Sequence, residues 1–232
     1  IEAAMLSHGH WDHAGGLPKA LDFIRAARGG RRVPLYLHPG MFRERGGRQP
    51  DGGVFPMETV PRPEAWAGMG AEPVVTDRPQ ALFDGLLWIS GEIPRRTPYE
   101  RGLPGAVARD DDASPWESDE LLMDERFCAV QLRGRGLVVF SACSHAGIVN
   151  VLHAAREALP GVKLHAVMGG FHLSGENEAV IPETVRDLAG FDLPLLIPAH
   201  CTGWRAVNAL ERAFGERVGP AAVGKLFTLD GA

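Results

Sequence analysis

The sequence is poor in cysteine and has no long apolar run. Its three cysteines, Cys128, Cys143 and Cys201, are too few and too widely spaced for a disulfide framework or a paired-cysteine zinc site. No apolar run approaches the roughly 20 residues that span a bilayer, and the first residues lack the charged and then apolar order of a signal peptide. We therefore expect a reducing, cytoplasmic setting and no membrane partner.

Basic residues are outnumbered by acidic ones. The 232 residues include 24 Lys and Arg against 29 Asp and Glu, which gives a formal net charge of -5. Nucleic acid is not an expected partner, because binding it relies on basic residues that displace counterions from phosphates. An apolar fraction of 45% and a charged fraction of 23% are typical of globular proteins, and we expect a single domain over residues 1–232.

Predicted strands and helices alternate along the chain, most regularly after residue 127. Strands are predicted over residues 2–7, 33–38, 72–76, 86–90, 128–133, 137–141, 164–168, 193–198 and 223–229, and helices over 16–28, 148–159, 178–188 and 205–214. Residues 39–63 predict loop or short helix, and residues 91–120 predict a long loop near a site. This alternation indicates a layered α/β fold.

The segment Ser7-His8-Gly9-His10-Trp11-Asp12-His13 directly follows the first predicted strand. In an extended segment, side chains two positions apart point to the same side, so His8 and His10 can face one ion. Imidazoles and a carboxylate in such a cluster are costly to bury unless a cation compensates them, and they suit transition-metal ions. An exposed polar loop is the alternative, but the density of these side chains favours a metal site.

Three later histidines each follow a predicted apolar strand: His145, His172 and His200. Ligands often lie on loops at the carboxyl ends of strands in α/β folds, so we expect these histidines at the same sheet edge as the first motif. His145 and His200 are predicted metal ligands. His172 is either a ligand or a histidine that supports the ligands or binds substrate. For His38, His153 and His165, ordinary packing or solvent exposure is favoured.

The run from His8 to His13 with Gly15-Gly16 resembles the signature of the metallo-β-lactamase superfamily. Four further segments resemble one branch, commonly labelled dihydropterin-methyl ribofuranosylaminobenzene phosphate synthase-like: Ser90–Arg95, Cys143–Gly147, Gly169–Leu173 and Pro198–Gly203. This resemblance spans nearly the whole chain and implies an αββα sandwich with metals at the sheet edge. Members usually have two β-hairpins before the histidine motif. This chain has no room for them, so either an N-terminal segment is absent or the first sheet is built differently.

The resemblance also implies a dinuclear site for two divalent transition-metal ions, with zinc favoured over iron or manganese. By this interpretation, one ion is held by His8, His10 and His145, and the other by Asp12, His13 and His200. The ions would lower the pKa of bound water, and Asp12 would orient the resulting hydroxide. Asp12 and His172 are therefore the candidate catalytic residues.

Alignment with many relatives allows a different completion of the site. It places Glu92 where they carry a histidine ligand, and it places Cys143 or His145 where they carry an aspartate that bridges the metals. Glu92, Cys143 and His172 are therefore further candidate ligands. A loop carboxylate in a salt bridge is the alternative for Glu92, and a buried thiol is the alternative for Cys143.

These features together predict a metal-dependent hydrolase that acts on a small anionic molecule. Arg95 and Arg96 are the candidate substrate-binding residues, because a planar guanidinium suits a phosphate or a carboxylate. Arg101 lies on the same loop. No Gly-x-Ser-x-Gly elbow is present that would indicate a serine nucleophile. The alternatives are a transferase of the synthase type named above and a non-catalytic module that binds metal and a small ligand.

Overall fold

The computed structural model describes residues 1–231, which divide into two compact units. Unit 1 comprises residues 1–78 and 103–125, and unit 2 comprises residues 79–102 and the chain from residue 126 onward. Each unit has its own cluster of buried apolar side chains. The segment predicted as one long loop, residues 91–120, is shared between the two units. The single domain over residues 1–232 stays a prediction.

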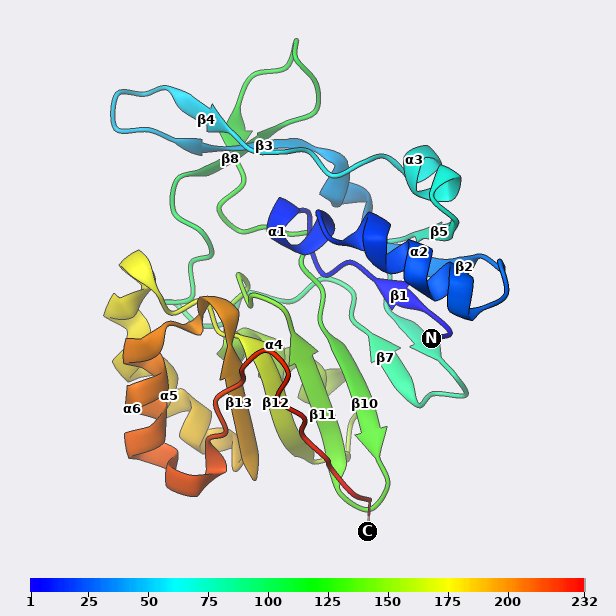
Figure 1. Cartoon of the computed structure of the whole chain (residues 1–232). Helices are drawn as coiled ribbons and strands as arrows, with labels where there is room; N and C mark the ends of the chain where they lie inside the picture. The colour runs from blue at the N-terminus through cyan, green and yellow to red at the C-terminus, as the bar shows by residue number, and fades with distance from the viewer. Residues whose placement is uncertain (232) are drawn as a thin grey trace. The chain divides into compact units, whose positions relative to one another are not determined.

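Unit 1 contains a three-stranded parallel sheet of order β1-β2-β5 (Figure 1). Its strands are β1 (Ala4–Met5), β2 (Val33–Leu37) and β5 (Ala71–Val75), and its α-helices are α1 (Trp11–Ala14), α2 (Leu17–Ala27) and α3 (Pro63–Gly68). Pro18 stands in the first turn of α2, where its missing N–H costs nothing. The predicted helix and the second predicted strand are confirmed, whereas the first strand is shorter than predicted.

A second, antiparallel sheet in unit 1 was not predicted. Its order is β4-β3-β8-β9, built from β3 (Glu44–Arg48), β4 (Val54–Pro56), β8 (Ala106–Arg109) and β9 (Glu117–Ser118), and the short 3-10 helix η1 (Pro39–Phe42) precedes it. The loop assignments over residues 39–63 and 91–120 were therefore wrong in part. The β3 sequence, with paired glycines and two arginines, has low strand propensity, and it is paired on one side with β8, about sixty positions later.

Unit 2 contains a six-stranded sheet of order β13-β12-β11-β10-β7-β6. The strands are β6 (Gln80–Leu82), β7 (Leu87–Ile89), β10 (Cys128–Leu132), β11 (Gly136–Ser141), β12 (Leu164–Gly170) and β13 (Leu195–Ala199). Pairing is antiparallel from β6 to β11 and parallel from β11 to β13. The parallel register places Ser141 beside Gly169, and Gly169 beside Pro198, so the three parallel strands end at one edge.

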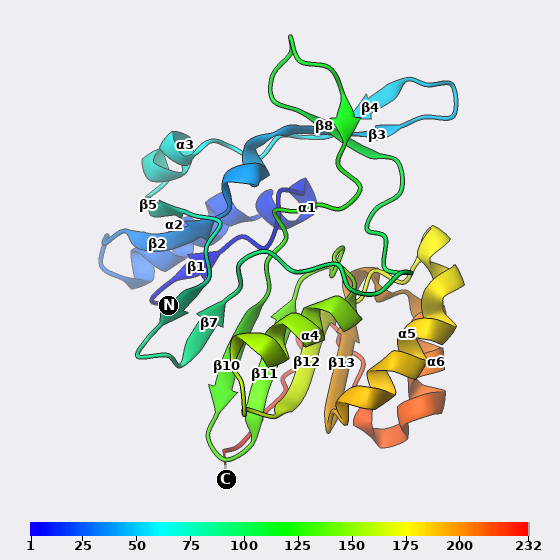
Figure 2. The same cartoon turned by 180° about the vertical axis from the view of Figure 1, so that it is seen from behind.

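Helices of unit 2 pack against this sheet (Figure 2). They are α4 (Ile148–Ala158), α5 (Ile181–Leu188) and α6 (Trp204–Phe214), with 3-10 turns η2 (Gly175–Val180), η3 (Ala189–Phe191), η4 (His200–Thr202) and η5 (Gly215–Arg217). Leu152 and Leu210 are among the helix side chains buried against strand residues such as Val139 and Val167. The predicted helix over residues 178–188 begins later than expected, because its first residues form η2.

The predicted last strand over residues 223–229 was wrong. The described residues there form a turn and extended chain without ladder pairing, and the side chains of Val223 and Leu226 are exposed. An apolar pattern makes a strand only where a neighbouring edge accepts its hydrogen bonds. In residues 1–231, no helix combines the length and apolar character that crossing a membrane requires.

The end of β12 depends on a close approach of two backbones. A Cβ added to Gly169 would lie 1.7 Å from the backbone oxygen of Ser141, and the φ angle of Gly169 is +136°. We expect Gly169→Ala to lower the free energy of unfolding by about 3 kcal/mol, because it combines backbone strain with a clash against backbone. Chemical denaturation followed by circular dichroism measures this loss.

Gly190→Ala is the matched control, because a Cβ there meets nothing within 4 Å. Its free energy of unfolding should stay within about 0.5 kcal/mol of the parent value. Equal stability of the two variants would contradict the close approach of β12 to β11.

Candidate metal centre

The predicted metal loop of unit 1 brings its histidines together between β1 and α1. Nε2 of His8 lies 3.1 Å from Nδ1 of His10, and the rings of His8 and His13 are 4.5 Å apart between centroids. Asp12 places an oxygen 3.3 Å from Nε2 of His13, and the Ser7 hydroxyl lies 3.0 Å from Nδ1 of His8. Imidazole nitrogens that converge in this way fit a metal ion such as zinc.

A buried ion pair holds the peptide of Gly9 at the centre of this loop. The Gly9 N–H donates to Oδ2 of Asp124 at 2.7 Å, and Nη1 of Arg45 donates to the Gly9 carbonyl at 3.2 Å. Arg45 also donates to the second oxygen of Asp124 and to Asp119, at 2.7 Å each. A Cβ on Gly9 would lie 2.7 Å from the backbone oxygen of Met41 and 2.0 Å from Nη1 of Arg45, so this position requires glycine.

Arg45 and Asp124 were missed from the sequence. Arg45 lies on β3 in a segment expected to be loop, and a charged residue in such a segment is usually exposed. Only an inward-facing position distinguishes it, and that position depends on pairing with β8. The pKa of His10 is lowered to about 4, first by burial and then by the positive charge of Arg45. This shift favours the neutral imidazole, which is the form that binds metal.

In unit 2, the three predicted strand-end histidines follow the parallel strands as expected. His145 comes after β11, His172 after β12 and His200 after β13. The rings of His145 and His172 are 4.2 Å apart between centroids. The φ angles of His172 and His200 are both +48°, and that of Ser144 is +58°. Left-handed backbone at residues with a side chain is strained and concentrates at functional sites.

The same edge of unit 2 contains two cysteines. Sγ of Cys201 lies 3.5 Å from the carbonyl oxygen of Cys143, and a Cβ on Gly170 would lie 2.6 Å from that sulfur. The pKa of Cys201 is lowered to about 4, first by its hydrogen bond with Cys143 and then by His172 and His200. Cys143 was a candidate ligand, whereas Cys201 was not singled out. Its position directly after His200 was the available signal.

One buried polar atom in unit 2 is suited to bind a metal ion or a ligand. Nδ1 of His172 is buried and has no hydrogen-bond partner within residues 1–231. A buried imidazole nitrogen without a partner is costly, and a metal ion or a bound molecule would satisfy it. The imidazole, thiol and carboxylate groups of the two units are donors that divalent transition metals accept.

The remaining predicted residues lie on the loop after β7. Glu92 is exposed, Arg95 donates to the carbonyl of Ile93, and Arg96 pairs with Glu157 of α4. Among the described residues, 1–231, a pocket lies next to His145 and His172, and none of these three residues lines it. Their roles as ligand and as substrate-binding residues stay predictions.

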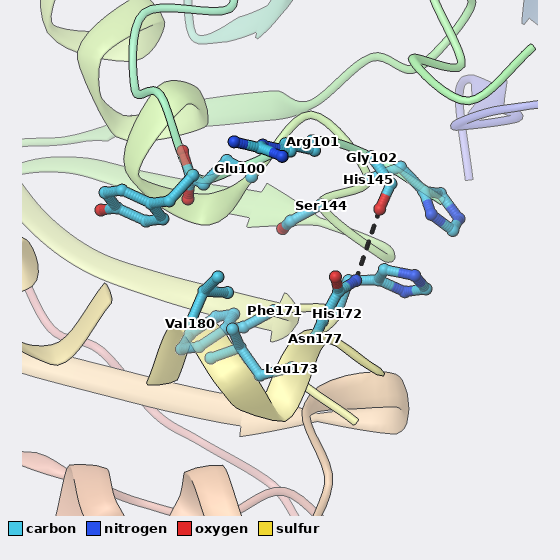
Figure 3. Close-up of a pocket in the computed structure, with 12 residues that line it drawn as sticks. Glu100, Arg101, Gly102, Ser144, His145, Phe171, His172, Leu173, Asn177 and Val180 are labelled. Carbon is cyan, nitrogen blue, oxygen red and sulfur yellow. Dashed lines mark hydrogen bonds between the residues drawn. The ribbon is translucent and has the colours of Figure 1, made fainter. Parts of the chain in front are cut away.

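That pocket is small, with a cavity volume of about 20 Å³, and lies entirely within unit 2 (Figure 3). It is lined by Tyr99, Glu100, Arg101, Gly102, Ser144, His145, Gly147, Phe171, His172, Leu173, Asn177 and Val180. Glu100 closes the N-terminus of α4, because its oxygens accept from the N–H groups of Val149 and Asn150 at 2.8 and 2.9 Å. Burial raises the pKa of Glu100 to about 7, although these hydrogen bonds oppose the shift.

The predicted ligands are therefore divided between the units. Unit 1 carries His8, His10, Asp12 and His13, and unit 2 carries Glu92, Cys143, His145, His172 and His200. The histidines of unit 1 lie together after β1, and those of unit 2 follow the parallel strands β11, β12 and β13. The assignment of individual ligands stays a prediction.

Comparison with known proteins supports the fold. No family model matches the sequence. The chain is 27% identical over 231 residues to the 7,8-dihydropterin-6-methyl-4-(beta-D-ribofuranosyl)-aminobenzene-5'-phosphate synthase of Methanocaldococcus jannaschii. This alignment covers 97% of this chain and 74% of the synthase. It is also 25% identical over 210 residues to an uncharacterized protein of that organism, covering 90% of this chain and 72% of that protein.

A solved structure has the same fold. The crystal structure of Tm1679, described as a metal-dependent hydrolase of the β-lactamase superfamily, aligns with a TM-score of 0.77 and 22% identity over 97% of this chain and 78% of that chain. The predicted α/β fold of the metallo-β-lactamase type is thereby confirmed. The sequence similarity also makes the chain a distant homologue of the synthase.

The Gly9 contact gives a test of what holds the metal loop. We expect Asp124→Ala to lower the free energy of unfolding by about 3 kcal/mol, because it leaves the buried Arg45 with one carboxylate and the Gly9 N–H without an acceptor. Asp110→Ala is the control, since the pair of Asp110 with Arg43 is exposed and should contribute little. If both variants unfolded at the same denaturant concentration, Asp124 would not be what holds the loop.

Proposed function

We propose that this chain is a metal-dependent hydrolase that cleaves a small anionic substrate. The observation that carries the proposal is the convergence of the His8 and His10 nitrogens to 3.1 Å, with His13 and Asp12 beside them. The fold shared with Tm1679 supports it, and so do the strained histidines at the strand ends of unit 2.

The proposed ligands of two divalent ions are His8, His10, Asp12 and His13 of unit 1 with His145 and His200 of unit 2. Zinc is the first choice, because neutral imidazole and carboxylate are its usual ligands, and iron and manganese are the alternatives. When bound, such ions supply water of lowered pKa and polarise the bond under attack. Asp12 is exposed beside His13 and is proposed to orient the attacking water, and the buried Nδ1 of His172 is proposed to contact substrate or metal.

A transferase is the second candidate function. The 27% identity over 97% of the chain with the Methanocaldococcus jannaschii synthase favours it. This candidate requires two substrates, and it predicts that a pterin and a phosphorylated ribosyl aminobenzoate are both consumed. Hydrolysis of a single phosphoester or lactone in the absence of any acceptor would favour the hydrolase.

Metal content is the first measurement for the proposed site. Protein purified without a polyhistidine tag should contain about two metal ions per chain, as measured by mass spectrometry. The substitutions His8→Ala and His200→Ala should each lower that metal content. The two variants test the ligands of unit 1 and unit 2 separately. His153→Ala is the control, because His153 lies on α4 beside Arg156 and Phe191 and should leave the content unchanged.

The same protein preparations can be assayed for hydrolytic activity. Chelation should abolish hydrolysis of a phosphoester or lactone panel, and addition of zinc, iron or manganese should restore it. Protein that stays free of metal after incubation with all three ions would contradict the proposed function. That result would favour a non-catalytic binding module.

A further inference from the structure

Helix α4 begins just after the candidate ligand His145, at a residue that cannot cap it. The residue before α4 is Gly147, which has a φ angle of +92° and no side chain to accept from the first N–H groups of the helix. Those N–H groups have no acceptors within the helix and need them elsewhere. His145 lies two residues before Gly147 and is buried. The group that satisfies the start of α4 therefore lies close to a candidate metal ligand.

Glu100, on the loop after β7, supplies these acceptors. Its two carboxylate oxygens accept from the N–H groups of Val149 and Asn150 at 2.8 and 2.9 Å, and the Thr97 hydroxyl donates to the same carboxylate at 2.8 Å. The side chain also lies directly on Gly147, because a Cβ there would lie 2.0 Å from Cδ of Glu100. The carboxylate therefore sets how closely the turn before α4 approaches the loop.

Asn150 joins the same turn to the same loop. Its Nδ2 donates to the carbonyl of Ala146 at 2.8 Å, and its Oδ1 accepts from the backbone N–H groups of Arg96 and Thr97 at 2.9 and 3.0 Å. Asn150 is fully buried, so water does not compete for these hydrogen bonds. The chain directly after His145 is thus held against the loop by two side chains.

Ser144 fixes the chain on the other side of His145. Its hydroxyl donates to the carbonyl of Gly170 at 2.6 Å, and its φ angle is +58°. Left-handed backbone at a residue with a side chain persists only where the surroundings enforce it. Glu100 and His145 also border the same small pocket (Figure 3). The direction in which His145 leaves the chain therefore depends on how the loop after β7 packs against this turn.

We propose that Glu100 is a positioning residue for the metal site, because its carboxylate fixes the turn that presents His145 to the ion. This role rests on the proposed function, which makes His145 a ligand. Groups that orient metal-bound histidines change the affinity for metal without touching the ion. A carboxylate suits this place because both of its oxygens accept hydrogen bonds, whereas an amide offers only one acceptor.

Titration of the metal-free protein with cobalt(II), followed by its visible absorption, tests this role. Glu100→Gln should weaken binding of the ion held by His145 about tenfold and should change its absorption bands, because an amide NH₂ cannot accept from an N–H of α4 and the turn shifts. Tyr99→Phe is the matched control on the same loop. It removes the hydrogen bond to Asp187 of α5, so it should lower the thermal midpoint but keep the affinity and the bands of the parent.

Thr97→Val provides a milder change at the same carboxylate. It removes the hydroxyl donor and should weaken cobalt binding in the same direction by a smaller factor. Parent-like affinity and absorption bands in folded Glu100→Gln would overturn the proposal, since Glu100 would then only stabilise α4. If Glu100→Gln does not fold, the same result in Thr97→Val would overturn it.

Failure of the positioning role can be distinguished from failure of the hydrolase. Cobalt binding that depends on Glu100, in a protein without any hydrolytic activity, would keep the positioning role and remove the proposed function. Metal-dependent hydrolysis with equal cobalt affinity in Glu100→Gln and the parent would keep the hydrolase and remove the positioning role. A parent protein that binds no cobalt would overturn both.

Discussion

The buried contact of Arg45 and Asp124 with the Gly9 peptide is the constraint on which the metal loop depends. Burying two charged side chains costs on the order of several kcal/mol for each ion, and the cost is offset only when their polar atoms are paired. Here Asp119, Asp124 and the Gly9 carbonyl all accept from Arg45. What this arrangement contributes is geometry, because a peptide held at both its N–H and its carbonyl fixes the directions in which His8 and His10 leave the chain.

Unit 2 positions its histidines by different means. Three parallel strands end at the same edge, and left-handed backbone follows at His172, two residues after β12, and at His200, directly after β13. That conformation costs about 1–3 kcal/mol at a residue with a side chain, and it persists only where the surroundings enforce it. The absence of a Cβ at Gly169 and Gly170 allows the strands to approach closely enough, so that His172 and Cys201 lie at the same edge.

The loop that follows β7 is held against the helices of unit 2. Most of its polar groups are satisfied within unit 2, since Glu100 binds the start of α4 and Tyr99 binds α5. Arg101 differs from Arg95 and Arg96, because its Nε donates to the carbonyl of Pro98 and its side chain is exposed. The three arginines of this loop have the same chemistry, and their surroundings give each of them a different partner.

The sequence by itself determined the α/β alternation, the helices α2, α4, α5 and α6 and the clustering of histidines in residues 7–13, because periodicity, helix ends and closely spaced polar residues are local patterns. It also predicted which histidines end the parallel strands. Tertiary structure decided the pairing of β3 with β8, the burial of Arg45 against Asp124, and the approach of Cys201 to Cys143. These contacts join residues tens of positions apart. The apolar segment after residue 222 formed no strand for the same reason, since pairing requires a partner edge that a local pattern does not specify.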